Sequence, residues 1–582
     1  MSNEKTDRHS HAAVARAATI VVPLAILLLF LPGRACAHGV PLVDRSVHDI
    51  TIPPPDRVGP DVYWPVPGSP TSPPPDPEVG DSWLWWLWIH YPMPPHFEQH
   101  MCTVRGKSDR GYVIVRDEEW LVSIDQEDVD AILDAWENSS IGPYPEMGIY
   151  EIDSLSFGEP PDELDNDPRI YLLWFDFGIA ADGYFFWFDE YPDGMYPEYH
   201  SNECEVLYLN TTSSGGPSGE YMLAVIAHEF EHMIHWKYDD NEAPWVDEGM
   251  AELAMWFYGN PDNISGFNTN PDNSLVVWDG TWADYIKTYL WSLYFFENYG
   301  GHPGAYAVVH ESDNSIQGYE DVLDLLGYQE GFADVFADWT VANFLDDTSI
   351  EDGRFGYDGD ELPPFGVSGT YSSYPAGGGY KQVNHWAADY YRFQDLTDFD
   401  NLLLTFDGDD GNGFAVWGLV LHDSSLTEVH RMTLEPSTQT GSVWLTGLSD
   451  PSDEVILVVG SASSAGGSGY YFWAEGVQGL TPDTGPGVGR LSLHASPNPF
   501  ASTVALELEW SGGSVTAAPA AGIYDLNGRL VRVLQPDQAA DGEASFLWDG
   551  RSASGELLPG GLYFARAGLE GATTGASLML LP

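Results

Sequence analysis

Apolar residues surround the polar ones on every side from residue 221 to residue 236, which predicts a buried helix. A second helix is predicted directly after it, because Pro244 suits a first turn and Gly259 suits the position where a helix ends. Asn241 or Glu242 lies near the start of this second helix. We expect the other elements in the first half of the chain to be arranged around these two neighbouring helices.

Shorter apolar runs predict the other elements of this region. Strands are expected at residues 83–89, 111–115, 170–177 and 205–209. Helices are expected at residues 128–136, 282–299, 319–326 and 332–345. Together these elements predict one domain of mixed strands and helices over residues 81–350.

The hydrophobic pattern changes near residue 352. From residue 368 to residue 477, apolar and polar residues alternate over short runs between Gly-rich and Asp-rich turns, which predicts a β-sandwich. Residues 478–490 are rich in Pro and Gly and predict a linker. Strand and turn signals recur at regular spacing over residues 491–582 and predict an immunoglobulin-like sandwich. The expected fold class is multidomain α+β.

The amino-terminal 37 residues predict a bacterial-type signal peptide, with a positive start, an apolar core at residues 17–31 and a small-residue cleavage site. The apolar core of about 15 residues falls short of the roughly 20 that span a membrane. Residues 38–80 are Pro-rich and predict an extended arm. Cleavage would leave Cys102 and Cys204, either as a disulfide in an oxidising compartment or as two free thiols.

Acidic residues outnumber basic ones by 89 to 22, giving a formal net charge of -67 over 582 residues. Such a surface repels nucleic acid and anionic membranes, so neither is an expected partner. It fits a secreted or cell-surface protein that self-repulsion keeps soluble. Hydrophobic and aromatic contents of 43% and 14% exclude a disordered acidic chain.

The first of the two helices contains the motif His228-Glu229-x-x-His232. Residues four apart share a helix face, so both imidazoles can reach one metal ion. Glu229 lies beside that metal, where it can handle the proton of a bound water molecule. The motif predicts His228 and His232 as zinc ligands and Glu229 as the general base.

A catalytic zinc needs a third protein ligand and an open position for water. His235 shares the stripe, but it lies roughly 10 Å from His228 along the helix axis, too far for two Zn–N bonds of about 2 Å. We therefore expect His235 to pack in the core, or to hydrogen-bond a group around the metal site, and not to bind the metal.

Glu248 and Glu252 share one face of a largely apolar helix, which is unusual for surface carboxylates. We expect Glu248 as the third ligand and Glu252 as the outer partner of a bound histidine, with the reverse assignment open.

The segments His228-Glu-Phe-Glu-His-Met-Ile-His and Trp245-Val-Asp-Glu-Gly-Met-Ala-Glu resemble the gluzincin group of zinc metalloproteases. They are particularly similar to secreted bacterial neutral proteases related to immune inhibitor A and hyicolysin, which carry His-Glu-Phe-Gln-His and Trp-Leu-Asn-Glu-Gly. The resemblance implies a zincin-type catalytic domain, a mixed sheet with active-site helices. In gluzincins the glutamate of the second segment is the third ligand, which favours Glu248.

The chain departs from this family at two positions. Glu231 stands where Gln is usual and Asp247 where Asn is usual, and neither change removes a ligand. A metzincin is excluded, because that pattern needs Gly and His where this chain has His235 and Tyr238.

The resemblance also implies parts of the site beyond the metal. Zincins pair an extended substrate with the sheet edge just before the metal-binding helix, which here makes residues 205–209 the candidate strand. Gluzincins often place a Tyr or His opposite the metal to stabilise the oxyanion. Tyr289 is the first candidate and Tyr285 the second, with His302 a further polar group; core packing is the alternative for both tyrosines.

The carboxyl-terminal region carries a second resemblance. Ser496-Pro-Asn-Pro-Phe500, Tyr524-Asp-Leu-Asn-Gly-Arg, Trp548-Asp-Gly550 and Gly561-Leu-Tyr-Phe564 resemble the FlgD-like or type IX secretion C-terminal sorting domain. This implies sorting or attachment through the secretion machinery. An ordinary stability or adhesion module is the alternative.

Four acidic residues between the predicted strands raise the question of structural calcium. Asp165, Asp167, Asp189 and Asp193 could bind it, but no twelve-residue calcium loop is present, and solvated turns are the simpler expectation.

These patterns together predict a secreted zinc metalloendopeptidase that acts on protein or peptide substrates. A gluzincin aminopeptidase is one rival, although the Gly-x-Met-Glu-Asn-type segment that would bind a free amine is missing upstream. A surface adhesin that keeps a metalloprotease-like domain as a scaffold is the other.

Overall fold

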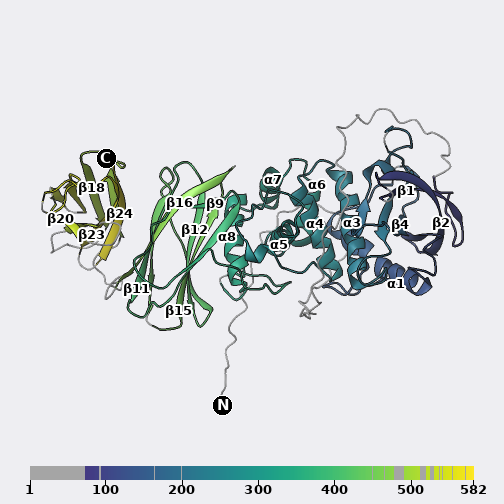
Figure 1. Ribbon diagram of the computed structural model, residues 1–582, viewed down its shortest axis with the longest axis horizontal. Helices are drawn as coiled ribbons and strands as arrows, with labels where there is room; N and C mark the ends of the chain where they lie inside the picture. The colour runs from purple at the N-terminus through teal and green to yellow at the C-terminus, as the bar shows by residue number, and fades with distance from the viewer. Residues whose placement is uncertain are drawn as a thin grey trace, which may run out of the picture. The chain divides into compact units, whose positions relative to one another are not determined.

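The computed structural model describes residues 72–90, 93–477, 490–511, 520–524 and 530–581, except residues 163, 198, 351, 449, 465, 537, 541, 554, 570 and 571. The predicted leader at 1–37, most of the Pro-rich arm and nearly all of the linker lie outside these residues. The chain divides into two compact units, one of residues 1–263 and 288–334 and one of residues 264–287 and 335–582. The fold is mixed α/β with several sheets (Figure 1).

The first unit contains a six-stranded sheet in the order β1–β2–β3–β4–β6–β5. Its strands are β1 (Ser82–Ile89), β2 (His96–Lys107), β3 (Gly111–Arg116), β4 (Ile170–Phe175), β5 (Gly183–Phe185) and β6 (Val206–Asn210). Strands β3, β4 and β6 are parallel, and the other pairs are antiparallel. Every residue of β4 and β6 is buried, as expected for parallel strands covered on both faces.

The helices of this unit are α1 (Gln126–Glu137), α2 (Ile149–Ser156), α3 (Glu220–Tyr238), α4 (Pro244–Tyr258), α6 (Gly301–His310) and α7 (Ile316–Leu326). All of these helices are predicted from the sequence except α2 and α6. Helix α5 (Trp282–Asn298) begins in the second unit and continues into the first from residue 288. Pro244 lies in the first turn of α4, and Gly259 ends it with a φ of 108°, a left-handed conformation that favours glycine. Helices α3 and α4 pack against each other.

The prediction that residues 205–209 form a sheet edge is wrong. Strand β6 pairs with β4 on one side and with the three-residue β5 on the other, so β5 is the end strand. Gly183–Phe185 lies between the predicted strands at 170–177 and 205–209, in a segment for which the sequence predicts no strand. Three residues are too few to show the alternation that predicts a strand.

The disulfide between Cys102 and Cys204 is not formed, because both residues are free and buried thiols. Cys102 lies on β2 and Cys204 directly precedes β6, and β3 and β4 lie between these two strands in the sheet. Three strand spacings of about 4.8 Å separate positions by roughly 14 Å, twice the Cα separation of about 7 Å that a disulfide tolerates. Burial raises the pKa of both thiols.

Both thiols are therefore expected to resist thiol reagents in the native protein. Titration with a coloured disulfide reagent at pH 8 should detect Cys102 and Cys204 only after unfolding, because buried thiols with raised pKa values are poor nucleophiles. A peptide map that shows the two cysteines linked would contradict the structure.

The second unit contains a β-sandwich and helix α8 (Phe332–Leu345), most of which belongs to this unit. One sheet has the order β13–β12–β15–β10–β7, and the other has the order β14–β11–β16–β8, with β9 paired to β16. The strands are β7 (Gly369–Tyr371), β8 (Ala376–Gly377), β9 (Lys381–Asn384), β10 (Ala387–Phe393), β11 (Asn401–Gly408), β12 (Phe414–His422), β13 (Ser425–Arg431), β14 (Thr440–Thr446), β15 (Asp453–Ser461) and β16 (Gly467–Val477). Their inward-facing residues form one apolar core.

The last strands form a second sandwich with a separate core. Its sheets have the orders β17–β18–β22–β21 and β20–β19–β23–β24. The strands are β17 (Arg490–Ser496), β18 (Val504–Ser511), β19 (Ala520–Tyr524), β20 (Leu530–Leu534), β21 (Gln538–Ala540), β22 (Glu543–Trp548), β23 (Gly561–Leu569) and β24 (Ala572–Leu580). Within the described part of the chain, no helix combines the length and apolar character needed to cross a membrane.

Candidate metal centre

Helices α3 and α4 bring three potential metal ligands together. The Nε2 atoms of His228 and His232 lie 3.1 Å apart on one face of α3. A carboxylate oxygen of Glu248, on α4, lies 3.6 Å from His228 Nε2 and 3.9 Å from His232 Nε2. All three side chains are buried, at 2%, 8% and 2% exposure.

The spacing of these three atoms fits a tetrahedral zinc ion. Zinc bonds of about 2.0–2.2 Å at tetrahedral angles separate neighbouring ligand atoms by roughly 3.3–3.5 Å. The observed separations of 3.1, 3.6 and 3.9 Å bracket this range. Two imidazole nitrogens and one carboxylate oxygen are also a donor set that zinc prefers.

Each histidine presents its other ring nitrogen to a further carboxylate. Glu252 Oε1 lies 3.4 Å from His228 Nδ1, and Asp247 Oδ1 lies 3.0 Å from His232 Nδ1. A carboxylate on the far nitrogen fixes the tautomer that leaves Nε2 free to bind a metal. The structure thus places Glu248 on the Nε2 side and Glu252 on the Nδ1 side of His228.

Glu229 is completely buried next to the short end strand β5. A Cβ atom added to Gly183 of β5 would lie 2.6 Å from Glu229 Oε1, so the backbone of the end strand passes directly over this carboxylate. Only glycine gives β5 room to approach Glu229 this closely.

A second group of potential ligands lies between the same two helices. Glu231 Oε1 is 3.1 Å from His235 Nδ1, and Asp247 Oδ1 is 3.6 Å from the same nitrogen. Burial alone would lower the pKa of His235, but the charge and hydrogen bond of Glu231 raise it to about 9. Burial acts to raise the pKa of Asp247, yet the neighbouring His232 lowers it below its ordinary value.

The expectation that His235 makes an outer hydrogen bond agrees with this contact. Sequence reasoning did not predict that Glu231 and Asp247 converge on His235. The spacing of four residues from Glu231 to His235 could have indicated the first contact, because such pairs meet on a helix surface. The contact with Asp247 depends on how α3 and α4 pack, which a single sequence does not reveal.

The three residues considered for oxyanion stabilisation have different surroundings. Tyr289 is completely buried in the first unit, and its role stays a prediction. Tyr285 belongs to the second unit, where its ring packs edge-on against Trp278. His302 Nδ1 shares a hydrogen bond of 2.8 Å with the Ser156 hydroxyl, and burial lowers its pKa to about 4.

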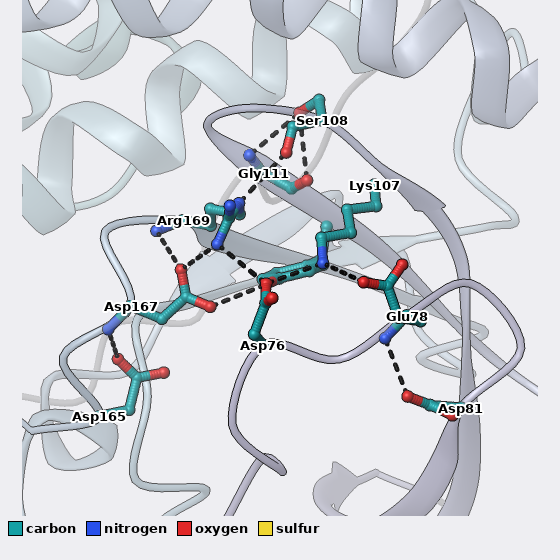
Figure 2. A network of polar contacts seen from close by, with 10 residues as sticks. Asp76, Glu78, Asp81, Lys107, Ser108, Gly111, Asp165, Asp167 and Arg169 are labelled. Carbon is teal, nitrogen blue, oxygen red and sulfur yellow. Dashed lines mark hydrogen bonds and ion pairs between the residues drawn. The ribbon is translucent and has the colours of Figure 1, made fainter.

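The four aspartates considered for calcium differ in their surroundings. Asp167 accepts hydrogen bonds from Arg169 and Tyr112, within a network that also joins Lys107 to Asp76 and Glu78 (Figure 2). The positive charge of Arg169 thus balances the negative charge of Asp167.

The expectation of a solvated turn is wrong for Asp189. This side chain is fully buried and accepts hydrogen bonds of 2.6 Å from the backbone N–H of Asn202 and 2.7 Å from the Tyr208 hydroxyl. Burial raises the pKa of Asp189 to about 7. Among the described residues, the clusters able to hold a metal include none of the four aspartates.

Comparisons with known proteins bear on two parts of the chain. The FlgD Ig-like domain family matches residues 500–570, which agrees with the carboxyl-terminal immunoglobulin-like sandwich. The neutral metalloprotease ShpI of Staphylococcus hyicus is 28% identical over 167 residues, which cover 24% of this chain and 37% of that protein. The chain therefore spans little more than a third of the length of this relative. The similarity to this metalloprotease is thus distant and partial.

Solved structures give weaker likenesses. Latent PorU of Porphyromonas gingivalis is 17% identical over 31% of this chain and 18% of that chain, with a TM-score of 0.17. A β-glucuronidase of Bifidobacterium dentium is 13% identical over 33% of this chain and 39% of that chain, with a TM-score of 0.15. At these TM-scores neither structure supports a conclusion about this chain.

Proposed function

We propose that this protein is a secreted zinc metalloendopeptidase, with His228, His232 and Glu248 as zinc ligands and Glu229 as general base. The observation that carries the proposal is the convergence of two imidazole nitrogens and one carboxylate oxygen from α3 and α4 at separations of 3.1–3.9 Å. The partial similarity to a neutral metalloprotease supports the same reaction class.

The chemistry divides between the metal and the protein. A bound zinc ion would lower the pKa of a water molecule and polarise the scissile carbonyl. Glu229 would accept the proton of the attacking water and pass it to the leaving amine. Asp247 and Glu252 would hold the rings of His232 and His228 in the orientation that binding requires.

The sheet offers a place for the substrate. In the described sheet, β5 has a neighbouring strand on one side only, and its backbone reaches Glu229. An extended peptide could pair with the other side of β5 and so bring a peptide bond close to this carboxylate. We therefore transfer the substrate-pairing role from residues 205–209 to Gly183–Phe185.

Replacing Gly183 by alanine tests this arrangement. The added methyl group would displace the Glu229 carboxylate, and misplacement of a catalytic group by about 1 Å can cost about 10²-fold in rate. We expect Gly183→Ala to lower kcat/KM for casein by about this factor, and to lower the melting temperature because the buried site is overpacked. Gly379→Ala is the matched control, because no atom lies within 4 Å of the added Cβ. Full activity in Gly183→Ala would show that β5 does not set the position of Glu229.

The predicted leader and the carboxyl-terminal domain suggest where the protein is located. We propose export through the leader at residues 1–37, followed by sorting or surface attachment through the immunoglobulin-like domain. The match of residues 500–570 to the FlgD Ig-like family supports the domain type.

Metal removal is the direct test of the enzyme class. We expect a zinc chelator to abolish cleavage of casein by the purified chain, and stoichiometric zinc to restore it, because the three ligands hold the ion that activates water. Cleavage that persists without metal would contradict the proposal. Zinc binding without cleavage of casein or gelatin would instead favour a surface scaffold that keeps the ligand set.

A further inference from the structure

We propose that Glu231, His235 and Asp247 form a second zinc site, which joins helices α3 and α4 beside the first site. This inference adds a structural cation to the proposed metallopeptidase. The three residues contribute one imidazole nitrogen and two carboxylate oxygens, all within 4.8 Å of one another. This donor set suits a divalent first-row metal, zinc above all.

The separations from His235 to the two carboxylates resemble those of the first group, and the two carboxylate oxygens lie within 4.8 Å of each other. His235 Nδ1 lies 3.1 Å from Glu231 Oε1 and 3.6 Å from Asp247 Oδ1. Tetrahedral zinc separates its ligand atoms by roughly 3.3–3.5 Å. The two distances from His235 bracket this range, as do the distances between His228, His232 and Glu248.

The surroundings also call for a positive charge. Glu231 is completely buried, and its second oxygen, Oε2, has no hydrogen-bond partner. Asp153 is buried nearby, and neither of its oxygens has a hydrogen-bond partner. Burial, and after it the charge of Glu231, raise the pKa of Asp153. Glu242 and Asp239 add further negative charge near His235. A divalent cation would balance more of this charge than a proton on one imidazole.

The location gives such a cation a structural role. Glu231 and His235 lie on α3, whereas Asp247 lies on α4, so the ion would tie together the two helices that carry the proposed catalytic ligands. Asp247 would serve both sites, because its Oδ1 also lies 3.0 Å from His232 Nδ1. Its side chain is 36% exposed, which leaves a route for the ion and a position for water as fourth ligand.

Zinc stoichiometry tests the proposal. We expect elemental analysis of the full chain, equilibrated in a buffer of fixed free zinc, to give two zinc ions for the wild type and one for Asp247→Asn. Asparagine keeps an oxygen that can accept the hydrogen bond from His232 but loses the anionic ligand. His235→Gln should also bind one zinc ion. His430→Gln should bind two, because His430 lies on β13 and contacts Glu428 there.

A zinc titration of the metal-free wild-type chain provides the same answer without a variant. Two zinc ions per chain are expected, and the loss of the weaker one should lower the melting temperature. One zinc ion in the wild type that Asp247→Asn and His235→Gln both retain would overturn the second site. If the first site is wrongly assigned, the result differs: Glu248→Gln should then retain as much zinc as the wild type.

Discussion

Replacing Glu229 by glutamine is expected to lower kcat for casein cleavage by about 10²–10⁴-fold, the range associated with a general acid–base group. Glutamine has nearly the same shape as glutamate but cannot accept the proton of the attacking water. The side chain is completely buried beside β5, so few other groups can reach the same position. Zinc content should be unchanged, because Glu229 is not a ligand in the proposed site.

The matched control is Glu220→Gln, which makes the same change in the first turn of the same helix. Glu220 is exposed, and its replacement should leave activity at the wild-type level. Wild-type rates in Glu229→Gln would remove the proposed general base. A loss of rate together with loss of zinc would show that Glu229 acts through the metal site and not through the proton.

The second large effect concerns the third ligand. Replacing a residue that hydrogen-bonds a metal ligand typically weakens metal binding by about 10–100-fold. We expect Glu248→Gln to weaken zinc binding by more than this, because it removes a ligand. Glu252→Gln should fall within that range. The reason is geometric, because the Glu248 oxygen lies 3.6 Å from the Nε2 of His228, whereas the Glu252 oxygen lies 3.4 Å from its Nδ1.

Competition with a chromophoric chelator measures both affinities. Equal folding of the two variants can be checked by circular dichroism, since both residues are buried in α4. If Glu252→Gln lost zinc more completely than Glu248→Gln, the roles of the two glutamates would have to be exchanged.

The helices that carry the site could be predicted from local pattern. The apolar surroundings of residues 221–236 and the Pro244 and Gly259 signals give α3 and α4 within two residues of their observed ends. The side-by-side placement of His228 and His232 follows from helix geometry alone. The fold class was predicted in part, since the several sheets and the immunoglobulin-like carboxyl-terminal domain are present.

The features that the sequence did not reveal depend on contacts between distant segments. Strand β5 exists because Gly183–Phe185 pairs with β6 and leaves room for Glu229, and three residues carry no periodicity. The separation of Cys102 from Cys204 follows from strand order, which composition cannot supply. Asp189 lies in a short 3-10 helix (Trp187–Glu190), and its buried carboxylate accepts hydrogen bonds from Asn202 and Tyr208, which are 13 and 19 residues further along the chain.

Anomalous diffraction at the zinc absorption edge, from crystals of the full chain, tests the central claim most directly. The account predicts a peak at about 2.0–2.2 Å from the Nε2 atoms of His228 and His232 and from a carboxylate oxygen of Glu248. A separate peak between Glu231, His235 and Asp247 would bear only on the second site. A Glu248 side chain turned away from both imidazoles, with no peak between them, would contradict the account.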